Sequence, residues 1–400
     1  MTSLRRVVMV ASVLPHHSIG GMQAVTWDLA CALVAAGVEV TVLTAAIPGR
    51  APEFNDKGVA IRALPKTQCR HYGPGWWRAT RNAFVRGPIA HCDLVLSVSA
   101  AGFGLLRFRE RIPHVPFAMQ AHGTSMGEFV SKWRARNVKS MVTSARNLAW
   151  IAKDMTAYPH FDAIVAVGNR VAHDLASWPT RRAVDPARVH VIRNGIDTVT
   201  FRPDPNAARR VRAEFGWGQE IRVVVSASRL HRQKGIALGL RGFAQLAANR
   251  ADLRYLIVGD GSERATLRQE AAALGVGDYV HFTGPVTRTE IPAYLNAADV
   301  MLFTTTHVEG EPLNILESLA VGLPVVVSRH LLSNSLVNNL IIPVTPTEPS
   351  EVATALRGAL AIRSPRQSHL PEAYTASSAV AQYIALFDRL VRERATAKRG

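Results

Sequence analysis

The sequence predicts an α/β protein of two doubly wound domains, each a parallel sheet covered by helices on both faces. Short apolar runs rich in β-branched residues alternate with stretches of helical periodicity, which is typical of parallel sheets. The alternation starts again near the middle of the chain. A chain of 400 residues with 48% hydrophobic content is long enough for two cores.

The first half opens with an apolar run at residues 7–13, which predicts a buried strand. Gly20 and Gly21 follow, and a helical pattern then runs to Ala35, where Gly37 ends it. The later strands predicted in this half are residues 38–43, 94–97, 117–120, 164–167 and 189–192.

The second half repeats this order after Pro203 and Pro205, which interrupt the chain. Its predicted strands are residues 223–227, 255–258, 280–282, 300–303 and 325–327. We therefore expect a first domain at residues 1–203 and a second at 204–372. The remaining residues, 373–400, contain a helix with apolar side chains at helical spacing, which we expect to pack back toward the first domain.

No apolar run reaches the roughly 18 residues that a membrane-spanning helix needs. Arg5 and Arg6 precede the first apolar run as in a signal peptide, but no small-residue cleavage site follows, so a buried strand is the better interpretation. Three cysteines without close spacing fit neither a disulfide framework nor a metal site. These features indicate a cytoplasmic location.

The net charge of +17 is unevenly distributed. Residues 1–200 contain 24 Lys and Arg against 12 Asp and Glu, whereas residues 201–400 contain 23 against 18. A basic first half predicts a polyanionic partner, either an acidic membrane surface or nucleic acid. No recognisable nucleic-acid-binding module is present, so nucleic acid is not expected as a partner.

The loops after the strands are the places to look for a site, because open α/β sheets bind ligands beyond the carboxyl ends of their strands. After the first strand, Gly20 and Gly21 either let backbone N–H groups approach a phosphate at a helix N-terminus or form an ordinary tight turn. His16 and His17 in the same loop suit either a general base or loop packing, and no obvious Asp orients either ring.

Arg229 and Lys234 come just after the first strand of the second domain. A bidentate guanidinium and a compact ammonium suit the negative charge that develops on a diphosphate leaving group. Each charge-assisted hydrogen bond contributes roughly 1.5–3 kcal/mol. A solvated basic loop is the alternative, and the position at a strand end favours the functional interpretation.

Two glutamates, Glu309 and Glu317, flank Pro312. Pro312 fits a first helical turn, so Glu309 is expected in the preceding loop and Glu317 inside the helix. Carboxylates accept hydrogen bonds from paired sugar hydroxyls, so one suits a hexose and the other a ribose. Gly310 permits close backbone approach, and the helix start favours an anion. By spacing alone, two surface glutamates are the simpler interpretation.

Together these residues resemble family 4 glycosyltransferases, a group of retaining enzymes, from about residue 7 to residue 327. Each motif is weak singly, and their shared order makes the set specific. The matching motifs are Gly20-Gly21, His122-Gly123, Asn194-Gly195-Ile196-Asp197 with Phe201 and Pro203, Arg229-Leu230 with Lys234-Gly235, Val258-Gly259-Asp260-Gly261, Phe282-Thr283-Gly284, Ala298-Asp299 and residues 309–317.

The resemblance implies the GT-B fold, in which two doubly wound Rossmann-like domains face a central cleft, and it implies roles for the matching residues. Arg229 and Lys234 would bind the donor diphosphate, and Glu309 would hold the transferred sugar near His122; these four are the implied catalytic residues. The implied donor-binding set is Gly20, Gly21, Arg229, Lys234, Glu309, Gly310, Leu313 and Glu317, with Glu317 on the ribose.

The resemblance also implies the reaction. A hexosyltransferase of this family moves a sugar from a UDP-, GDP- or ADP-sugar to an acceptor with retention of configuration. The donor phosphate would take the acceptor proton on the same face, so no protein base is required. We expect neither metal nor cofactor, since the family usually needs none and the chain lacks an Asp-x-Asp triplet of the kind that binds metal on a diphosphate.

Two features depart from the family pattern. Glu311 stands where relatives often carry an uncharged residue, and it either binds an amino sugar or faces solvent. The usual Gly-Gly-x-x-Glu segment is missing, and residues 328–334 stand in its place. A catalytically degenerate family member that docks on membranes is therefore an alternative to an active enzyme.

Acceptor contacts in this architecture come mainly from the first domain. Residues 75–86 combine Trp76 and Trp77 with arginines, and residues 132–146 form a second basic stretch. A helix carrying Trp and Arg can lie at an anionic bilayer surface. We therefore expect an enzyme peripheral at the inner face of the cell membrane, with a lipid-linked saccharide acceptor in polysaccharide or lipopolysaccharide assembly. A small acceptor, such as an antibiotic or a cyclitol, is the alternative.

Overall fold

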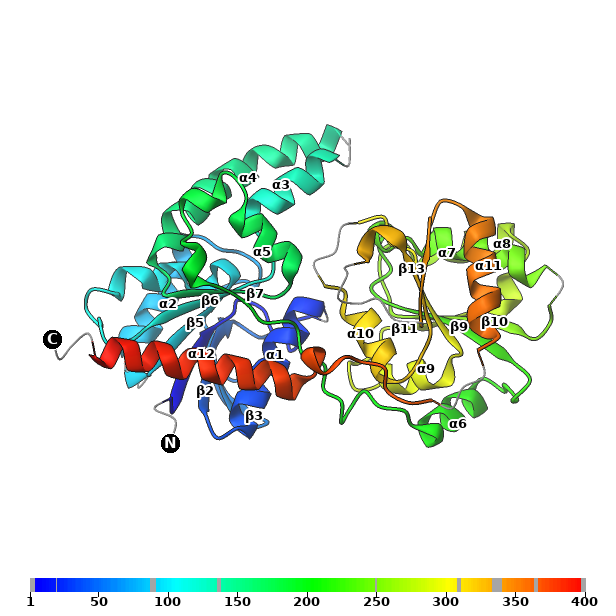
Figure 1. The fold of residues 1–400 in the computed structure, drawn as a ribbon, viewed down its shortest axis with the longest axis horizontal. Coiled ribbons are helices and arrows are strands. Elements are labelled where there is room, and N and C mark those ends of the chain that lie inside the picture. Colours follow the sequence, from blue (N-terminus) through cyan, green and yellow to red (C-terminus); the bar gives the residue numbers. More distant parts are fainter. Residues whose placement is uncertain are drawn as a thin grey trace. The chain divides into compact units, whose positions relative to one another are not determined.

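The computed structural model describes residues 4–18, 20–86, 91–134, 138–248, 250–307, 311–332, 340–362 and 366–396. Contacts divide the chain into two compact units, Met1–Gly195 with Ala373–Gly400 and Ile196–Glu372 (Figure 1). This division falls a few residues before the boundary expected at Pro203. Each unit contains a mostly parallel sheet covered by helices, which confirms the predicted fold class.

The first unit contains an eight-stranded sheet in the order β3-β4-β2-β1-β5-β6-β7-β8. Its neighbouring strands are parallel except for β3 and β4, which pair antiparallel. The strands are β1 (Arg6–Val10), β2 (Glu39–Ala45), β3 (Glu53–Asp56), β4 (Val59–Leu64), β5 (Leu94–Val98), β6 (Phe117–Ala121), β7 (Ala163–Ala166) and β8 (Val189–Val191).

Helices cover both faces of this sheet because alternate strand residues are apolar on each side. On one face, Met9 of β1 packs with Leu33 of α1 and Phe387 of α12. On the other face, Val8 packs with Trp76 of α2. The helical segments of this unit are α1 (Gly21–Ala35), α2 (Pro74–Arg86), η2 (Ser99–Phe108), α3 (Ser125–Arg134), α4 (Val138–Ala157), η3 (Tyr158–His160), α5 (Asn169–Ala176), η4 (Thr180–Arg182), η5 (Pro186–Arg188) and α12 (Ala376–Thr396).

The last helix, α12, lies beside α1 within the first unit (Figure 1). The backbone N–H of Leu4 donates to Asp388 Oδ1 at 3.3 Å, and Arg394 forms an ion pair with Asp162. The apolar side chains of its inner face belong to the same core cluster as α1. The C-terminal residues thus form an integral part of the first sheet's covering layer.

The sequence prediction missed three strands: the β3–β4 hairpin and β14 (Ile341–Val344). Lys57 and Gly58 join β3 to β4 with positive φ angles of 50° and 80°, a two-residue turn that suits twisted antiparallel strands. β3 is an edge strand without a fully buried residue, so it carries little of the apolar pattern on which the prediction depends.

The second unit contains a six-stranded, all-parallel sheet in the order β11-β10-β9-β12-β13-β14. The strands preceding β14 are β9 (Arg222–Ala227), β10 (Leu253–Val258), β11 (Val280–Gly284), β12 (Val300–Phe303) and β13 (Val325–Ser328). The helical segments are α6 (Pro205–Glu214), η6 (Arg232–Lys234), α7 (Ile236–Ala247), α8 (Arg264–Ala273), η7 (Gly277–Tyr279), α9 (Ile291–Ala297), α10 (Leu313–Ala320), η8 (Arg329–Leu331) and α11 (Pro349–Leu360). A short segment, η9 (Glu372–Tyr374), spans the boundary between the units, and its Tyr374 belongs to the first unit.

A largely buried carboxylate, Asp299, aligns the two central strands of this sheet where they begin. Asp299 accepts from Arg212 Nη2 at 2.8 Å, from Arg222 Nη1 at 3.2 Å and from the Val223 N–H at 2.8 Å. Its own N–H donates to the Val223 carbonyl. The Ala298-Asp299 motif of the sequence therefore has a structural role, because these bonds set the start of β12 against the start of β9.

The loop after β9 is attached to the end of β12 by two side-chain hydrogen bonds and by one close approach of the backbone. Thr304 Oγ1 donates to the Gly235 carbonyl at 2.8 Å, and Thr305 Oγ1 donates to the Gln233 carbonyl at 2.6 Å. Gly235 has a left-handed conformation with φ of 66°, and a Cβ there would overlap the Thr304 carbonyl oxygen. We call this arrangement the Gly235 latch.

Among the residues that the structure describes, no helix is long and apolar enough to cross a bilayer.

We predict that Gly235→Ala destabilises the protein more than Gly275→Ala does. Both glycines have positive φ, but a Cβ at Gly275 meets no atom within 4 Å, so that substitution carries the conformational cost alone. We expect Gly275→Ala to lower the free energy of unfolding by about 1 kcal/mol. Gly235→Ala should lower it by about 1–3 kcal/mol more, because the loop must move away from Thr304. Urea unfolding of both variants measures the difference, and equal losses would show that the latch does not constrain the loop.

Candidate functional site

Each sheet has a point at which its strand order reverses, and ligands of doubly wound sheets bind there, beyond the carboxyl ends of the strands. In the first sheet the reversal lies between β1 and β5, and in the second between β9 and β12. The predicted residues Arg229, Lys234, Leu313 and Glu317 belong to segments that follow β9 and β12. The second unit therefore brings these four to one edge of its sheet.

Arg229 and Lys234 lie in the loop that the Gly235 latch holds. Arg229 is exposed, and Lys234 is half-buried with Nζ 5.6 Å from the centroid of the Phe303 ring. The base of the loop is fixed from the other side by β10, since the Leu230 N–H donates to the Asp260 carbonyl at 2.9 Å. The loop thus carries the exposed Arg229 and the half-buried Lys234 beside the strand-order reversal.

The glycines of the Val258-Gly259-Asp260-Gly261 motif explain this close packing of loops. A Cβ at Gly259 would overlap the Ser228 carbonyl, and a Cβ at Gly261 would overlap the Leu230 carbonyl. Gly259 also has a φ of 127°, which favours glycine. These two residues therefore allow the loop that carries Arg229 to approach the end of β10.

Glu317 lies inside α10 as expected, and it is buried, with 3% of its surface exposed. Arg288 Nη1 donates to Glu317 Oε1 at 2.6 Å, and the Arg288 guanidinium stacks 5.1 Å from the Phe201 ring centroid. Such a partner offsets part of the cost of placing a carboxylate away from water. The sequence analysis missed Arg288, because nothing in the spacing of residues 288 and 317 links them before the sheet folds.

Leu313 is the first residue of α10, and its neighbour Asn314 approaches the Ala227 carbonyl at the end of β9 at 3.5 Å. Pro312 precedes the helix as its N-cap residue rather than lying within its first turn. The predicted residues Glu309 and Gly310 lie outside the described residues. Glu311 is partly buried, in contrast to the solvent-facing position that was one interpretation of it.

Gly20 and Gly21 lie in the first unit, where α1 begins at Gly21. The backbone of Gly20 is extended, with φ of 176°, and no side chain caps the first turn of the helix. A substituent on Gly20 would meet the Gln23 side chain, which is flexible. The N–H groups of this turn are thus presented by backbone alone, as a helix N-terminus that binds phosphate requires.

His122 follows β6 in the same unit and is partly buried. Its Nε2 atom lies 3.0 Å from Gln120 Oε1, and Gln120 Nε2 in turn donates to Tyr383 Oη at 2.8 Å. Burial lowers the pKa of His122 to about 4, so the imidazole is neutral near pH 7. The sequence analysis identified His122 and missed both of its supporting residues.

The other two candidate histidines are engaged in packing. His16 Nε2 lies 2.8 Å from Asp56 Oδ2, and its ring stacks edge-on against Trp27 at 4.8 Å. His17 accepts from the Leu14 N–H at Nδ1 and donates from Nε2 to the Ala45 carbonyl, both at 3.0 Å. The expectation that no Asp orients either ring was therefore wrong, because Asp56 lies in the unpredicted strand β3.

The tryptophans of α2 do not face solvent, which corrects their interpretation as membrane-surface side chains. Trp76 is 3% exposed and donates from Nε1 to the Ala101 carbonyl at 2.8 Å. Trp77 packs against Trp150 and lies under the Lys153 ammonium. The side chains of residues 132–146, the second basic stretch, lie outside those described.

Arginines form a basic surface on α2 and on η2, which packs against it. Arg78 and Arg81 lie about one turn apart on α2 and Arg107 lies on η2, and the pKa of Arg81 is lowered by burial and by the charges of Arg107 and Arg78. Val85, one turn further along α2, is 57% exposed. We call Arg78, Arg81 and Arg107 the α2 arginine cluster.

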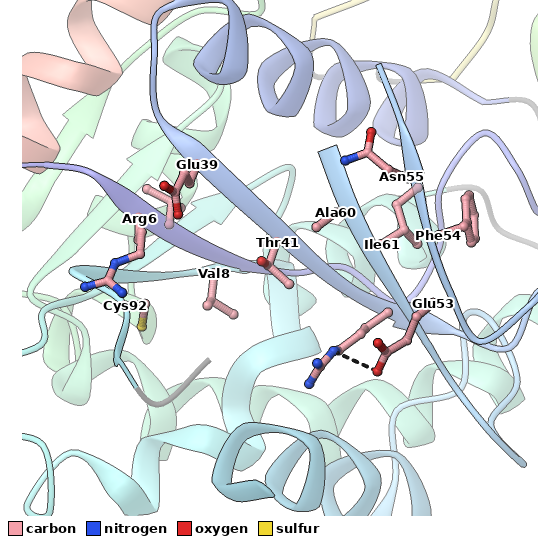
Figure 2. A pocket seen from close by; sticks show the side chains of 12 residues that line it. Arg6, Val8, Glu39, Thr41, Glu53, Phe54, Asn55, Ala60, Ile61 and Cys92 are labelled. Atoms are coloured by element: carbon pink, nitrogen blue, oxygen red, sulfur yellow. Dashed lines mark ion pairs between the residues drawn. The ribbon is translucent and has the colours of Figure 1, made fainter. Parts of the chain in front are cut away.

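A cavity of about 520 Å³ in the first unit lies away from the predicted residues (Figure 2). Arg6 and Glu39, the first residues of β1 and β2, line it together with Cys92, and Glu53 pairs with Arg62 at its wall. These residues mark the amino ends of the strands, opposite the edge at which doubly wound sheets bind ligands. We assign it no role in the chemistry.

Two family models match the chain one after the other. Residues 19–200 match the model described as Glycosyltransferase Family 4, and residues 208–374 match the one described as Glycosyl transferases group 1. Together the two models cover most of both units.

Three curated relatives from actinobacteria are similar to the chain. A GDP-mannose-dependent alpha-(1-6)-phosphatidylinositol monomannoside mannosyltransferase of Mycolicibacterium smegmatis is 38% identical over 141 residues, which cover 34% of this chain and 37% of the relative. The Mycobacterium tuberculosis protein of the same name is 29% identical over 337 residues, covering 81% and 80%. D-inositol 3-phosphate glycosyltransferase of Streptomyces coelicolor is 27% identical over 357 residues, covering 80% and 76%.

Solved structures agree in fold across nearly the whole chain. Sucrose-phosphate synthase from Thermosynechococcus elongatus superposes with a TM-score of 0.70 at 17% identity, covering 99% of this chain and 98% of that one. HepE of Anabaena, solved in complex with UDP-glucose, superposes with a TM-score of 0.65 at 18% identity, covering 98% and 99%. The motif order, the two doubly wound units and the consecutive family matches lead to one conclusion: the chain is a glycosyltransferase of family 4 with the GT-B fold.

Proposed function

We propose that this glycosyltransferase moves a hexose from a nucleotide diphosphate donor to a phosphorylated, lipid-linked acceptor with retention of anomeric configuration. The Gly235 latch is the observation that supports the proposed binding of the donor. It fixes the loop of Arg229 and Lys234 at the reversal between β9 and β12, where a doubly wound sheet binds its ligand. The latch gives these cations a fixed place, which electrostatic catalysis requires.

In this proposal Arg229 and Lys234 bind the donor diphosphate, and α10 holds the nucleoside. Arg288 pairs with the Glu317 carboxylate and orients it, so that its remaining acceptor sites can receive the ribose hydroxyls. Glu309, Gly310 and Leu313 would bind the hexose at the start of α10. In the first unit, backbone N–H groups at Gly20 and Gly21 would offer a phosphate the start of α1.

The chemical step is a same-face substitution. The bond from the anomeric carbon to the diphosphate oxygen breaks, the acceptor oxygen bonds to that carbon, and the acceptor proton passes to the departing phosphate oxygen. Arg229 and Lys234 stabilise the charge that develops on the diphosphate, so no metal ion is needed. The packing of His16 and His17 supports a mechanism without a protein base, since both ring nitrogens of His17 are hydrogen-bonded within the first unit and His16 Nδ1 is buried.

We predict that Lys234→Ala or Glu309→Ala lowers sugar transfer by at least about 100-fold while the protein stays folded. Each variant removes one group that acts on charge or on the sugar in the transition state. Arg232→Ala is the matched control, because Arg232 is an exposed cation of the same loop with no assigned role. Diphosphate release with a panel of UDP-, GDP- and ADP-sugars measures turnover.

Donor binding is measured separately by thermal stabilisation with the same panel. A donor at 100 times its dissociation constant stabilises the folded protein by about 2.7 kcal/mol. Lys234→Ala should lose this shift and Arg232→Ala should keep it. Turnover of Lys234→Ala at the wild-type rate would contradict the assigned role, and stabilisation without transfer to any acceptor would identify a degenerate family member.

The acceptor half of the proposal is supported by the relatives' names and by the α2 arginine cluster. The mycobacterial relatives are named for phosphatidylinositol monomannoside, and the Streptomyces relative for an inositol phosphate. Both names contain a phosphorylated inositol, one in a membrane lipid and one in a small molecule. A cationic cluster beside the exposed Val85 suits the lipid form, which would place the enzyme at the inner face of the cell membrane.

We predict that replacing Arg78, Arg81 and Arg107 together by Ala weakens binding to vesicles containing phosphatidylinositol by about 100-fold. Each arginine near an anionic bilayer contributes about 1 kcal/mol, and the attraction falls with added salt. Vesicle sedimentation measures binding, with neutral phosphatidylcholine vesicles and Arg209→Ala, an exposed arginine of the second unit, as controls. Efficient transfer to soluble inositol phosphate without vesicle binding would instead establish a small-molecule acceptor.

A further inference from the structure

A chain of buried polar groups runs from α12 to His122 within the first unit. Gln120, the fourth residue of β6, is 1% exposed, so both ends of its amide need partners inside the protein. Its Nε2 donates to Tyr383 Oη at 2.8 Å, and its Oε1 lies 3.0 Å from His122 Nε2. Tyr383 is itself buried, and burial raises its pKa, so the phenol keeps its proton.

This geometry determines which nitrogen of His122 carries the proton. An amide oxygen only accepts hydrogen bonds, so the nitrogen that faces Gln120 Oε1 must be Nε2–H. Burial lowers the pKa of His122 to about 4, and no charged side chain contributes to that shift. The ring is therefore neutral near pH 7, with Nε2 as a donor to the protein and Nδ1 as an acceptor.

The position of the amide depends on a helix from the far end of the chain. Tyr383 lies 263 residues after Gln120. Two contacts fix α12, the helix that carries Tyr383, on the first unit, one near the middle of the helix and one near its end. Asp388 accepts from the Leu4 N–H, and Arg394 pairs with Asp162. The phenol thus reaches the end of β6 from a rigid element.

We propose that Gln120 and Tyr383 are positioning residues that hold His122 in its Nε2–H tautomer, so that Nδ1 accepts a hydrogen bond from a hydroxyl of a bound sugar substrate. This inference rests on the proposed function, in which the substrates of the enzyme are sugars. His122 touches the sugar in this proposal, whereas Gln120 and Tyr383 act only through His122. An alternative explanation of the same contacts is that the amide and the phenol merely satisfy each other's buried hydrogen-bonding groups.

The tautomer is tested first, on the full chain without any ligand. In protein labelled with ¹⁵N-histidine, the imidazole nitrogen shifts distinguish Nε2–H from Nδ1–H, and His122→Ala identifies the signals by their loss. We expect Nε2–H in the wild type, with no titration of this ring above about pH 5. Gln120→Leu should give a mixture of tautomers. Gln120→Glu should raise the pKa of His122, because a carboxylate beside the ring favours its charged form.

The functional link is tested by turnover. We expect Tyr383→Phe to lower kcat about tenfold with little change in the donor KM, because the hydroxyl orients a group that acts on bound sugar. In the His122→Ala variant, Tyr383→Phe should lower kcat no further, because the histidine through which the phenol acts is absent. Tyr374→Phe is the matched control. It deletes another hydroxyl of the first unit, one that accepts from Arg193 Nη1 at 2.9 Å, and it should leave the tautomer and kcat unchanged.

Four results would overturn the proposal. Two concern the tautomer: Nδ1–H in the wild type, or an unchanged tautomer in Gln120→Leu. Two concern kcat: an equal loss in Tyr383→Phe and Tyr374→Phe, or a loss from Tyr383→Phe that is as large in the His122→Ala variant as in the wild type. Each of them would leave the amide and phenol as packing partners only. If no donor supports transfer by the wild type, the proposed function fails, and the ligand-free tautomer measurement still decides whether Gln120 and Tyr383 set the state of His122.

Discussion

The contact between Gly235 and the Thr304 carbonyl is the constraint on which the second unit's functional edge depends. β9 and β12 are neighbouring parallel strands whose connections leave in opposite directions, so the loops that follow them do not belong to one connection. The latch joins them by satisfying two loop carbonyls with threonine hydroxyls. A residue with a Cβ does not fit, which explains why glycine directly follows Lys234.

Charges in the second unit are organised in two ways. Asp299 and Glu317 are largely buried, and each is paired with arginine, because an isolated carboxylate is costly away from water. The pair at Asp299 aligns the starts of β9 and β12, whereas the pair at Glu317 lies on the helix that follows β12. Structural ion pairs thus occupy one end of the strands, and groups suited to a charged ligand gather at the other.

The first unit uses its polar groups differently. His16 and His17 hold the loop between β1 and α1 against β3 and β2, so the segment that ends at Gly20 is supported by the hydrogen bonds of both rings. His122 is kept neutral by burial and faces Gln120, which α12 supports through Tyr383. The basic charge of this unit remains on its surface, where the α2 arginine cluster lies.

What the sequence by itself determined is local: the buried strands, the glycines at their ends, the order of the motifs and therefore the family. These follow from apolar periodicity and backbone conformation, which act over a few residues. Only the tertiary structure decided that Asp56 pairs with His16, that Arg288 pairs with Glu317, that Tyr383 supports Gln120 and that Trp76 faces inward. Such pairs depend on sheet order and helix placement, because their members are tens to hundreds of residues apart and no local pattern links them.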